Sequence, residues 1–303
     1  MASSTADAAV ASTRRATTIG FGAVLLWALL APLGVLTAGL PPFLTTGLAF
    51  LVAAAVGFAA LARRGRSWRT AFAPAGWPWV VGVGGLFGFH ALYFTSLRYA
   101  PAVEASLITY LWPLLIVLLQ ALLPGGALAP RHLVGALMGL SGTVILVSRD
   151  GPLAFSADAW VGYLAAGAAA LTWGTYSVVN RLVGKGLTSD AVTGFCTVTA
   201  ALALAAHLLV EPTPVPGPWA WLAVIGLGLG PVGLAFFLWD HGTKHGDLRV
   251  LGVSAYAAPL LSTLILVAVG LAAATPGLAL AVLLIVGGAA WASDRAWRVG
   301  RRG

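Results

Sequence analysis

The sequence contains two copies of one pattern, separated by 146 residues. This single shift pairs landmarks of the first half with landmarks of the second: Trp27 with Trp173, Gly82 with Gly228, Gly84 with Gly230, Gly142 with Gly288, and Tyr110-Leu111-Trp112-Pro113 with Tyr256-Ala257-Ala258-Pro259. Because one offset serves matches spread along most of a copy, the chain is a tandem repeat. An odd number of membrane spans per copy would insert the second copy upside down, an arrangement common in secondary transporters.

The composition requires lipid as the solvent. Hydrophobic residues make up 59% of the chain and charged residues 9%, with a mean hydropathy of +0.93. Soluble domains carry about 25% charged residues. The apolar runs are continuous and about 20 residues long, which is the helix length for a bilayer core and unlike the short alternating strands of a barrel. We therefore predict an all-α polytopic membrane protein.

The apolar runs predict ten transmembrane helices, at residues 17–36, 41–62, 77–98, 102–123, 131–148, 159–182, 189–210, 218–240, 248–270 and 276–293. Each copy then holds five spans, so we expect two inverted five-helix repeats, residues 1–150 and 151–303, in one membrane domain. The first run matches the sixth through Trp27 and is too long for a usual signal core, so we expect it to be retained.

The distribution of Lys and Arg supports this count. With the N-terminus in the cytoplasm, fifteen of the seventeen basic residues fall inside and only Arg98 and Arg149 fall outside. Removing one span would reverse the later loops and destroy the asymmetry, so the positive-inside rule favours both termini in the cytoplasm.

Several function classes have no support in the sequence. The net charge of +8 is spread between the apolar runs rather than gathered on one face, so no nucleic-acid partner is expected. Cys196 is the single cysteine and lies in an apolar run, where it is expected to be a core residue. The sequence has no phosphate-binding loop, no nucleophile elbow and no metal-ligand spacing, so we expect no cofactor and no metal.

Polar and aromatic residues inside the third and fourth spans predict a binding cavity. His90 and Tyr93 are three residues apart and share a helical face. At 1.5 Å per residue, His90 and Tyr110 lie at roughly 20 and 18 Å in a ~30 Å core, so they share a level with Trp112 nearby. Polar groups at this depth are costly and usually functional. The sixth span adds Trp173 and Tyr176, again three residues apart.

Prolines in the middle of three spans predict breaks or gates. Pro113 and Pro259 are repeat-related, and each follows a tyrosine by three residues, which makes Tyr256 the counterpart of Tyr110. Pro231 lies in the glycine-rich eighth span. A proline removes a helix hydrogen bond, which membranes tolerate where the freed group faces protein or a watery cavity.

One cluster near the end of the eighth span offers a different interpretation. Asp240-His241 and Lys244-His245-Gly246-Asp247 could serve a membrane enzyme acting on lipid headgroups. We expect this cluster to be a solvated loop on the cytoplasmic side. No carboxylate lies at mid-depth in any predicted span.

The repeat, the ten spans and two stretches together resemble a known family. Phe89-His90-Ala91-Leu92-Tyr93 and Leu107-Ile108-Thr109-Tyr110-Leu111-Trp112-Pro113-Leu114-Leu115 are similar to the aromatic amino-acid exporters of the YddG type, in the EamA-like branch of the drug/metabolite transporter superfamily. The resemblance implies a basket-shaped fold with a central cavity, and export of aromatic and other neutral amino acids. It also implies that His90, Tyr93, Tyr110, Trp112 and Trp173 line or gate that cavity.

The prediction is therefore a secondary exporter of amino acids, not an enzyme, that acts by alternating access. It is expected as a monomer in the inner membrane of a bacterium. An exporter of another metabolite or of a cationic drug-like compound is the alternative, because cations bind aromatic faces. The sequence leaves open the preferred substrate and the choice between proton coupling and facilitated diffusion.

Overall fold

The computed structural model describes residues 2–37, 39–123, 128–148, 155–184 and 186–298, and within these ranges the chain is helical and contains no strand. Four basic residues of the charge count, Arg149, Lys185, Arg301 and Arg302, lie outside them. The all-helical prediction is confirmed for the described part of the chain.

The helices of the first half are α1 (Ala2–Trp27), α2 (Leu30–Leu36), α3 (Pro42–Arg63), α4 (Trp77–Val83), α5 (Phe89–Tyr99), α6 (Ala102–Thr109), α7 (Trp112–Ala121) and α8 (Pro130–Ser148). Those of the second half are α9 (Trp160–Val183), α10 (Ala191–Val210), α11 (Pro218–Leu229), α12 (Ala235–His245), α13 (Leu248–Ser254), α14 (Ala257–Ala268) and α15 (Pro276–Arg298). Short turns η1 (Trp68–Phe72) and η3 (Ala157–Ala159) precede α4 and α9.

Nine segments of the described ranges are long and apolar enough to cross a membrane, and they match nine of the ten predicted spans. The remaining prediction corresponds to α9, which has 24 residues but carries Trp, Tyr, Thr and Ser side chains that lower its hydropathy. This helix contacts α4, α5, α6, α7 and α12, while Leu164 and Leu171 lie on an exposed face. The chain is therefore a multi-pass helical protein in which α9 touches more of its neighbours than its hydropathy alone would suggest.

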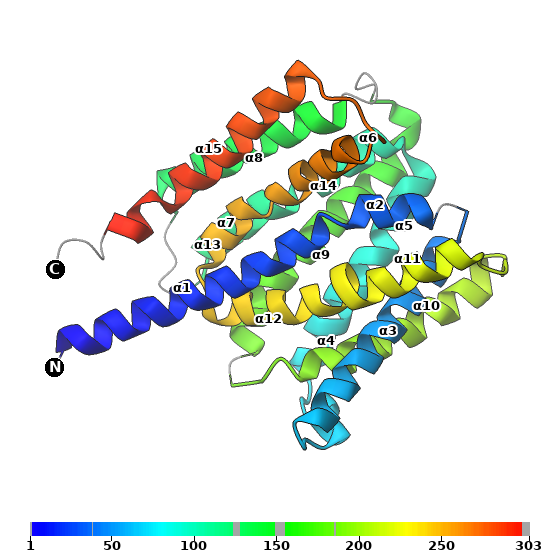
Figure 1. Ribbon diagram of the computed structural model, residues 1–303, viewed down its shortest axis with the longest axis horizontal. Coiled ribbons are helices and arrows are strands. Elements are labelled where there is room, and N and C mark those ends of the chain that lie inside the picture. Colours follow the sequence, from blue (N-terminus) through cyan, green and yellow to red (C-terminus); the bar gives the residue numbers. More distant parts are fainter. Residues whose placement is uncertain (1, 38, 124–127, 149–154, 185, 299–303) are drawn as a thin grey trace.

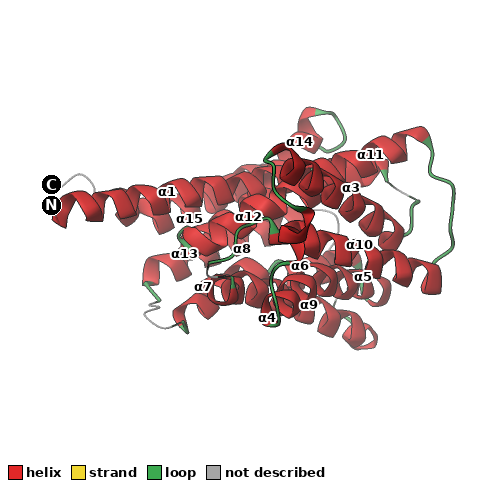
Figure 2. Ribbon diagram, turned by 90° about the horizontal axis from the view of Figure 1, so that it is seen from below, coloured by secondary structure: helices red, strands yellow, loops and turns green. Residues whose placement is uncertain are grey.

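The first helix begins well before the predicted span. Helix α1 starts at Ala2, whereas the apolar run starts at residue 17. The added segment is rich in alanine, the residue with the highest helix propensity, so the helix continues beyond the apolar run. Both views place the start of α1 and the end of α15 at the same end of the bundle, here named the terminal end (Figures 1 and 2).

The most extensive helix contacts join one half of the chain to the other. Helix α8 packs along α15, α3 along α10, α1 along α12, and α5 along α9 (Figure 1). The repeat shift converts the α1–α12 pair into the α9–α5 pair, as expected for two related copies. Neither half therefore forms its core alone.

Glycines permit the closest of these approaches. A Cβ atom on Gly135 of α8 would lie 2.6 Å from the carbonyl oxygen of Gly288 in α15, and the reverse substitution would meet Gly135 at the same distance. Small residues at membrane helix interfaces let backbones approach in this way.

Four spans are interrupted at repeat-related places. The π-helical turns η2 (Gly84–Gly88) and η4 (Gly230–Leu234) interrupt α4–α5 and α11–α12. The α6–α7 span breaks after Thr109, and the α13–α14 span breaks after Ser254. These breaks lie at or close to glycines and prolines of the two copies, because glycine and proline both weaken regular helix.

Candidate functional site

A cavity of about 470 Å³ lies between the two halves of the bundle. Aromatic rings from five helices and from the α6–α7 break form much of its wall: Trp27, Phe89, His90, Tyr93, Phe94, Tyr110, Trp112, Trp173 and Phe236. The cavity extends along α2 to Gly34 and reaches Thr45 in the first turn of α3. It therefore extends away from the terminal end of the bundle.

The polar groups of the wall are uncharged hydroxyls and one imidazole. The lining hydroxyl residues, apart from the two tyrosines, are Thr45, Thr46, Ser106, Thr109 and Ser262. Among the described residues that line the cavity there is no Asp, Glu, Lys or Arg. The Ser262 hydroxyl is buried and has no hydrogen-bond partner among the described residues.

Four tryptophans close the cavity toward the terminal end, and we name them the tryptophan floor: Trp27, Trp112, Trp173 and Trp239. The Trp27 ring lies 5.9 Å from Trp112, 5.8 Å from Trp173 and 4.9 Å from Trp239, measured between centroids. Most of these contacts are edge-to-face, the geometry that aromatic quadrupoles favour. Trp239 is fully buried beneath the other three and does not line the cavity.

His90 is oriented by the π-helical turn before it. Its Nδ1 lies 2.7 Å from the carbonyl oxygen of Leu86, and since a carbonyl only accepts, Nδ1 carries the proton of this bond. The ring lies edge-to-face against Phe50 and Phe236, at 5.3 and 6.4 Å between centroids. The remaining nitrogen, Nε2, is then a hydrogen-bond acceptor in the neutral ring.

The prolines lie at the helix breaks, and two of them reach the cavity. Pro231 lies in η4, and its carbonyl oxygen accepts a hydrogen bond from Trp27 Nε1 at 3.1 Å. Pro259 lines the cavity near the start of α14, while Pro113 is buried in the first turn of α7 and is not a lining residue. The bond from Trp27 satisfies one backbone group in an irregular turn.

The structure gathers five of the seven predicted binding residues around the cavity: His90, Tyr93, Tyr110, Trp112 and Trp173. The other two, Tyr176 and Tyr256, lie behind the wall. Tyr176 packs beneath Trp173 at 5.0 Å and fills the space beside Gly85. Tyr256 is fully buried against Gly139 of α8. Neither tyrosine ring faces the space that a ligand would fill.

Sequence reasoning missed other parts of the wall. Trp27 is the repeat partner of Trp173, so symmetry could have identified it as a lining residue. Phe236 stacks on Phe50 at 5.5 Å and also lines the cavity, but a phenylalanine in an apolar span carries no separate signal. The lining threonines of α3 could not be selected from the sequence either, because threonine is common in membrane helices.

The expectation of a solvated loop around residues 240–247 is wrong for Asp240 and Lys244, which are both buried. Asp240 accepts hydrogen bonds from Asn180 and Ser189 and pairs with Lys244. These first two partners lie far away in sequence, so only the tertiary fold brings them to the carboxylate.

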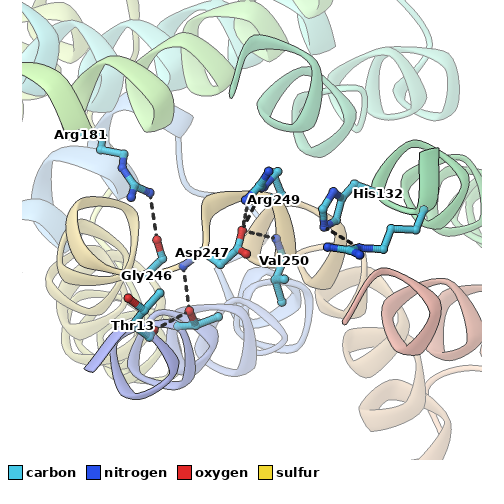
Figure 3. A network of polar contacts seen from close by, with 9 residues as sticks. Thr13, His132, Arg181, Gly246, Asp247, Arg249 and Val250 are labelled. Carbon is cyan, nitrogen blue, oxygen red and sulfur yellow. Dashed lines mark hydrogen bonds and ion pairs between the residues drawn. The ribbon is translucent and has the colours of Figure 1, made fainter. Parts of the chain in front are cut away.

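In the rest of that cluster, His245 is exposed, while Gly246 and Asp247 have structural roles at the terminal end. Asp247 caps α13 by accepting from the backbone N–H groups of Arg249 and Val250, and Arg181 donates to the carbonyl oxygen of Gly246 at 2.9 Å (Figure 3). In the described ranges no group of three His, Cys, Asp or Glu residues could hold a metal ion.

Comparison with known proteins agrees with this architecture. The model of the EamA-like transporter family matches residues 15–148 and again residues 160–293, so both copies of the repeat match one family. The chain belongs to the EamA-like transporter family. As a family member it is a transporter, and the lipid-enzyme interpretation of the cluster at residues 240–247 is set aside.

Relatives of this EamA-like transporter include named exporters. It is 52% identical over 280 residues to a protein named aromatic amino acid exporter YddG from Ancylobacter novellus, covering 92% of this chain and 96% of the relative. A protein of the same name from Salmonella typhimurium is 27% identical over 55% of this chain and 60% of its own length. A solved structure titled "Crystal structure of protein" has 51% identity and a TM-score of 0.90, covering 95% of this chain and 99% of that one.

Proposed function

We propose that this transporter exports aromatic and other neutral amino acids through the cavity. The observation that carries the proposal is a wall of rings and hydroxyls with no formal charge among its described residues. Its relative from Ancylobacter novellus bears the name of an aromatic amino acid exporter.

The chemistry of the wall suits a zwitterion that carries a large side chain. Burying a charged group is costly unless it is paired, so a wall without charge favours a ligand with no net charge. Each aromatic contact adds about 0.5–1.5 kcal/mol beyond area burial, which favours ring-bearing side chains. The break at Tyr110 places irregular backbone beside the cavity, and Pro259 brings the first turn of α14 to it, as in transporters that bind charged groups with helix ends.

In this proposal the residues that line the cavity contact the substrate, and Tyr176 and Tyr256 support the wall from behind. The prolines keep their predicted role in bending the spans, with Pro231 and Pro259 at the cavity and Pro113 behind it. No cofactor or metal enters the proposal.

The proposed topology has ten spans, with α9 as the sixth, in two inverted repeats, residues 1–150 and 151–303. Both termini then lie in the cytoplasm of a bacterial cell, the protein sits in the inner membrane, and it works as a monomer. The terminal end of the bundle is the cytoplasmic end, so the cavity opens to the outer side. Export requires the tryptophan floor to open toward the cytoplasm at another stage, which is alternating access.

Transport by the purified protein tests the proposal. Proteoliposomes should take up labelled phenylalanine faster than empty vesicles, and Trp173→Ala should reduce the rate at least about tenfold, because the ring lost from the wall contributes packing and stacking. Trp219→Phe, at an exposed tryptophan that does not line the cavity, is the control and should retain the rate.

A competition panel separates the two substrate classes. Unlabelled leucine, methionine and tryptophan should compete with phenylalanine, and tetraalkylammonium ions should not. Competition by the cations alone would favour the cationic-compound exporter, since cations also bind aromatic faces.

A further inference from the structure

A carboxylate is buried directly beneath the tryptophan floor, outside the cavity. Asp240 in α12 is fully buried and accepts hydrogen bonds from Asn180 Nδ2 at 2.9 Å and Ser189 Oγ at 2.6 Å. The ammonium of Lys244, whose side chain is 3% exposed, lies 2.9 Å from the same carboxylate. We name these four residues the Asp240 hub.

The hub joins separate segments of the terminal end. Asn180 belongs to the last turns of α9, Ser189 lies in the link before α10, and Asp240 lies in α12. The residue after Ser189 extends the connection, because Asp190 is buried and pairs with Arg64 at 3.2 Å and also with Arg66, both beyond the end of α3. One small region thus holds α3, α9, α10 and α12 together.

The hub also positions the floor. Trp239 immediately precedes Asp240, and its Nε1 donates to Ser177 Oγ at 3.1 Å. The Ser177 hydroxyl in turn donates to the carbonyl oxygen of Trp173 at 2.8 Å. A displacement of α12 away from α9 would therefore separate Trp239 from Trp173 and open the floor.

A charged hub suits a contact that must break and re-form. Burying two ions costs several kcal/mol, and well-packed apolar residues often stabilise a fold as well or better, so the pair is weak evidence for stability alone. The Asp240–Lys244 pair lies within α12, so separation of the segments breaks the bonds from Asn180 and Ser189 and leaves the ion pair intact. Water then hydrates both charges, which offsets the lost contacts. An apolar contact gains no such compensation, because its surfaces are then exposed to water.

We propose that Asp240 is a positioning residue for transport, whose hub holds the cytoplasmic closure and whose release opens the cavity to the cytoplasm. The proposal rests on the proposed function insofar as it assumes alternating access through this cavity. It assigns Asp240 no contact with substrate, because Asp240 does not line the cavity.

Side-specific labelling tests the proposal without using any substrate. The single native cysteine is replaced by Cys196→Ser, and Ser106→Cys places a thiol in the cavity wall at a residue that is only partly buried. A charged, membrane-impermeant maleimide is applied to one side of the membrane at a time. With Asp240 intact, the thiol should react from the outer side and slowly from the cytoplasmic side. Asp240→Asn should raise the cytoplasmic-side rate at least about tenfold and lower the outer-side rate.

Two further variants keep the test decisive. Asp247→Asn removes a carboxylate at the same end of the bundle that caps α13, and it should change neither rate by more than about twofold. If Asp240→Asn alone does not fold, the double variant Asp240→Asn with Lys244→Met removes both charges and leaves no unpaired ammonium. It should show the same shift between sides.

The outcomes are distinct. Equal rises from both sides indicate general loosening and overturn the proposal, as do unchanged rates in a folded Asp240 variant. If wild-type protein does not transport phenylalanine but the labelling shifts as expected, the proposed substrate fails and the role of the hub stands. If phenylalanine is transported and labelling does not shift, the hub fails and the proposed function stands.

Discussion

The two broken spans that are related by the repeat, α6–α7 and α13–α14, share a backbone plan but direct their tyrosines to different places. Tyr110 lines the cavity, whereas Tyr256 is fully buried against Gly139 of α8. The repeat partner of Gly139 is Ile285, a fully buried residue of α15. Gly139 therefore gives the Tyr256 ring room behind the second break, and the repeat shift puts no glycine at the equivalent position of the other copy.

The comparison shows that symmetry in sequence sets where the helices break, and local packing sets which side chains face the ligand. The repeat-related tryptophans Trp27 and Trp173 differ in the same way. Within the described part of the chain, Trp27 donates its indole N–H to the carbonyl oxygen of Pro231 in η4, and no such bond is found for Trp173. A duplicated scaffold thus builds a cavity with two unlike walls.

The largest expected effect is on stability, at the second break. Tyr256→Ala should lower the free energy of unfolding by about 3–5 kcal/mol, because it empties a fully buried aromatic site. Denaturant unfolding of the purified protein in detergent measures this loss. A loss below about 1 kcal/mol would mean that the ring is not part of the core.

The matching change at the first break should affect transport instead. Tyr110→Ala removes a lining ring and should reduce phenylalanine transport about tenfold, equivalent to about 1.4 kcal/mol, with a smaller loss of stability than Tyr256→Ala. Transport and unfolding are measured on the same preparations. Equal stability losses in the two variants would erase the contrast between the breaks.

A loss of stability smaller than that of Tyr256→Ala is expected at the paired tryptophans. Trp27→Phe keeps a ring but removes the donor to the carbonyl of Pro231, and losing a partner of a buried carbonyl costs about 1–3 kcal/mol. Trp173→Phe has no such bond to lose among the described contacts, so its thermal midpoint should fall less. The two midpoints, compared in one detergent, test whether the mates differ as the structure indicates.

The smallest effect is expected outside the comparison, at the exposed tryptophans. Trp219 is 71% exposed near the start of α11, as expected for an aromatic belt at the membrane interface. Trp219→Phe should change stability by less than about 0.5 kcal/mol and leave transport unchanged. A large transport defect here would show that the loss in Trp173→Ala is not specific to the cavity.

Much of the architecture could be predicted from the sequence, because the physics involved is local. Apolar runs of bilayer length define spans, and the three prolines mark the α6–α7, α11–α12 and α13–α14 breaks. The π-helical turn η2 contains no proline and is not among the breaks predicted from the sequence. His90, Tyr93, Tyr110, Trp112 and Trp173 could be selected as a group because polar and aromatic residues at mid-depth are unusual in lipid.

Contacts between distant segments decided the rest. Tyr256 is buried because α8 presents Gly139 beside its ring, and the burial of Asp240 involves Asn180 and Ser189, which approach it only in the folded bundle. Periodicity and composition describe how one helix meets its solvent. They contain no information about which helix stands opposite, and for this chain that neighbour determines which rings meet a ligand and which carboxylate is buried.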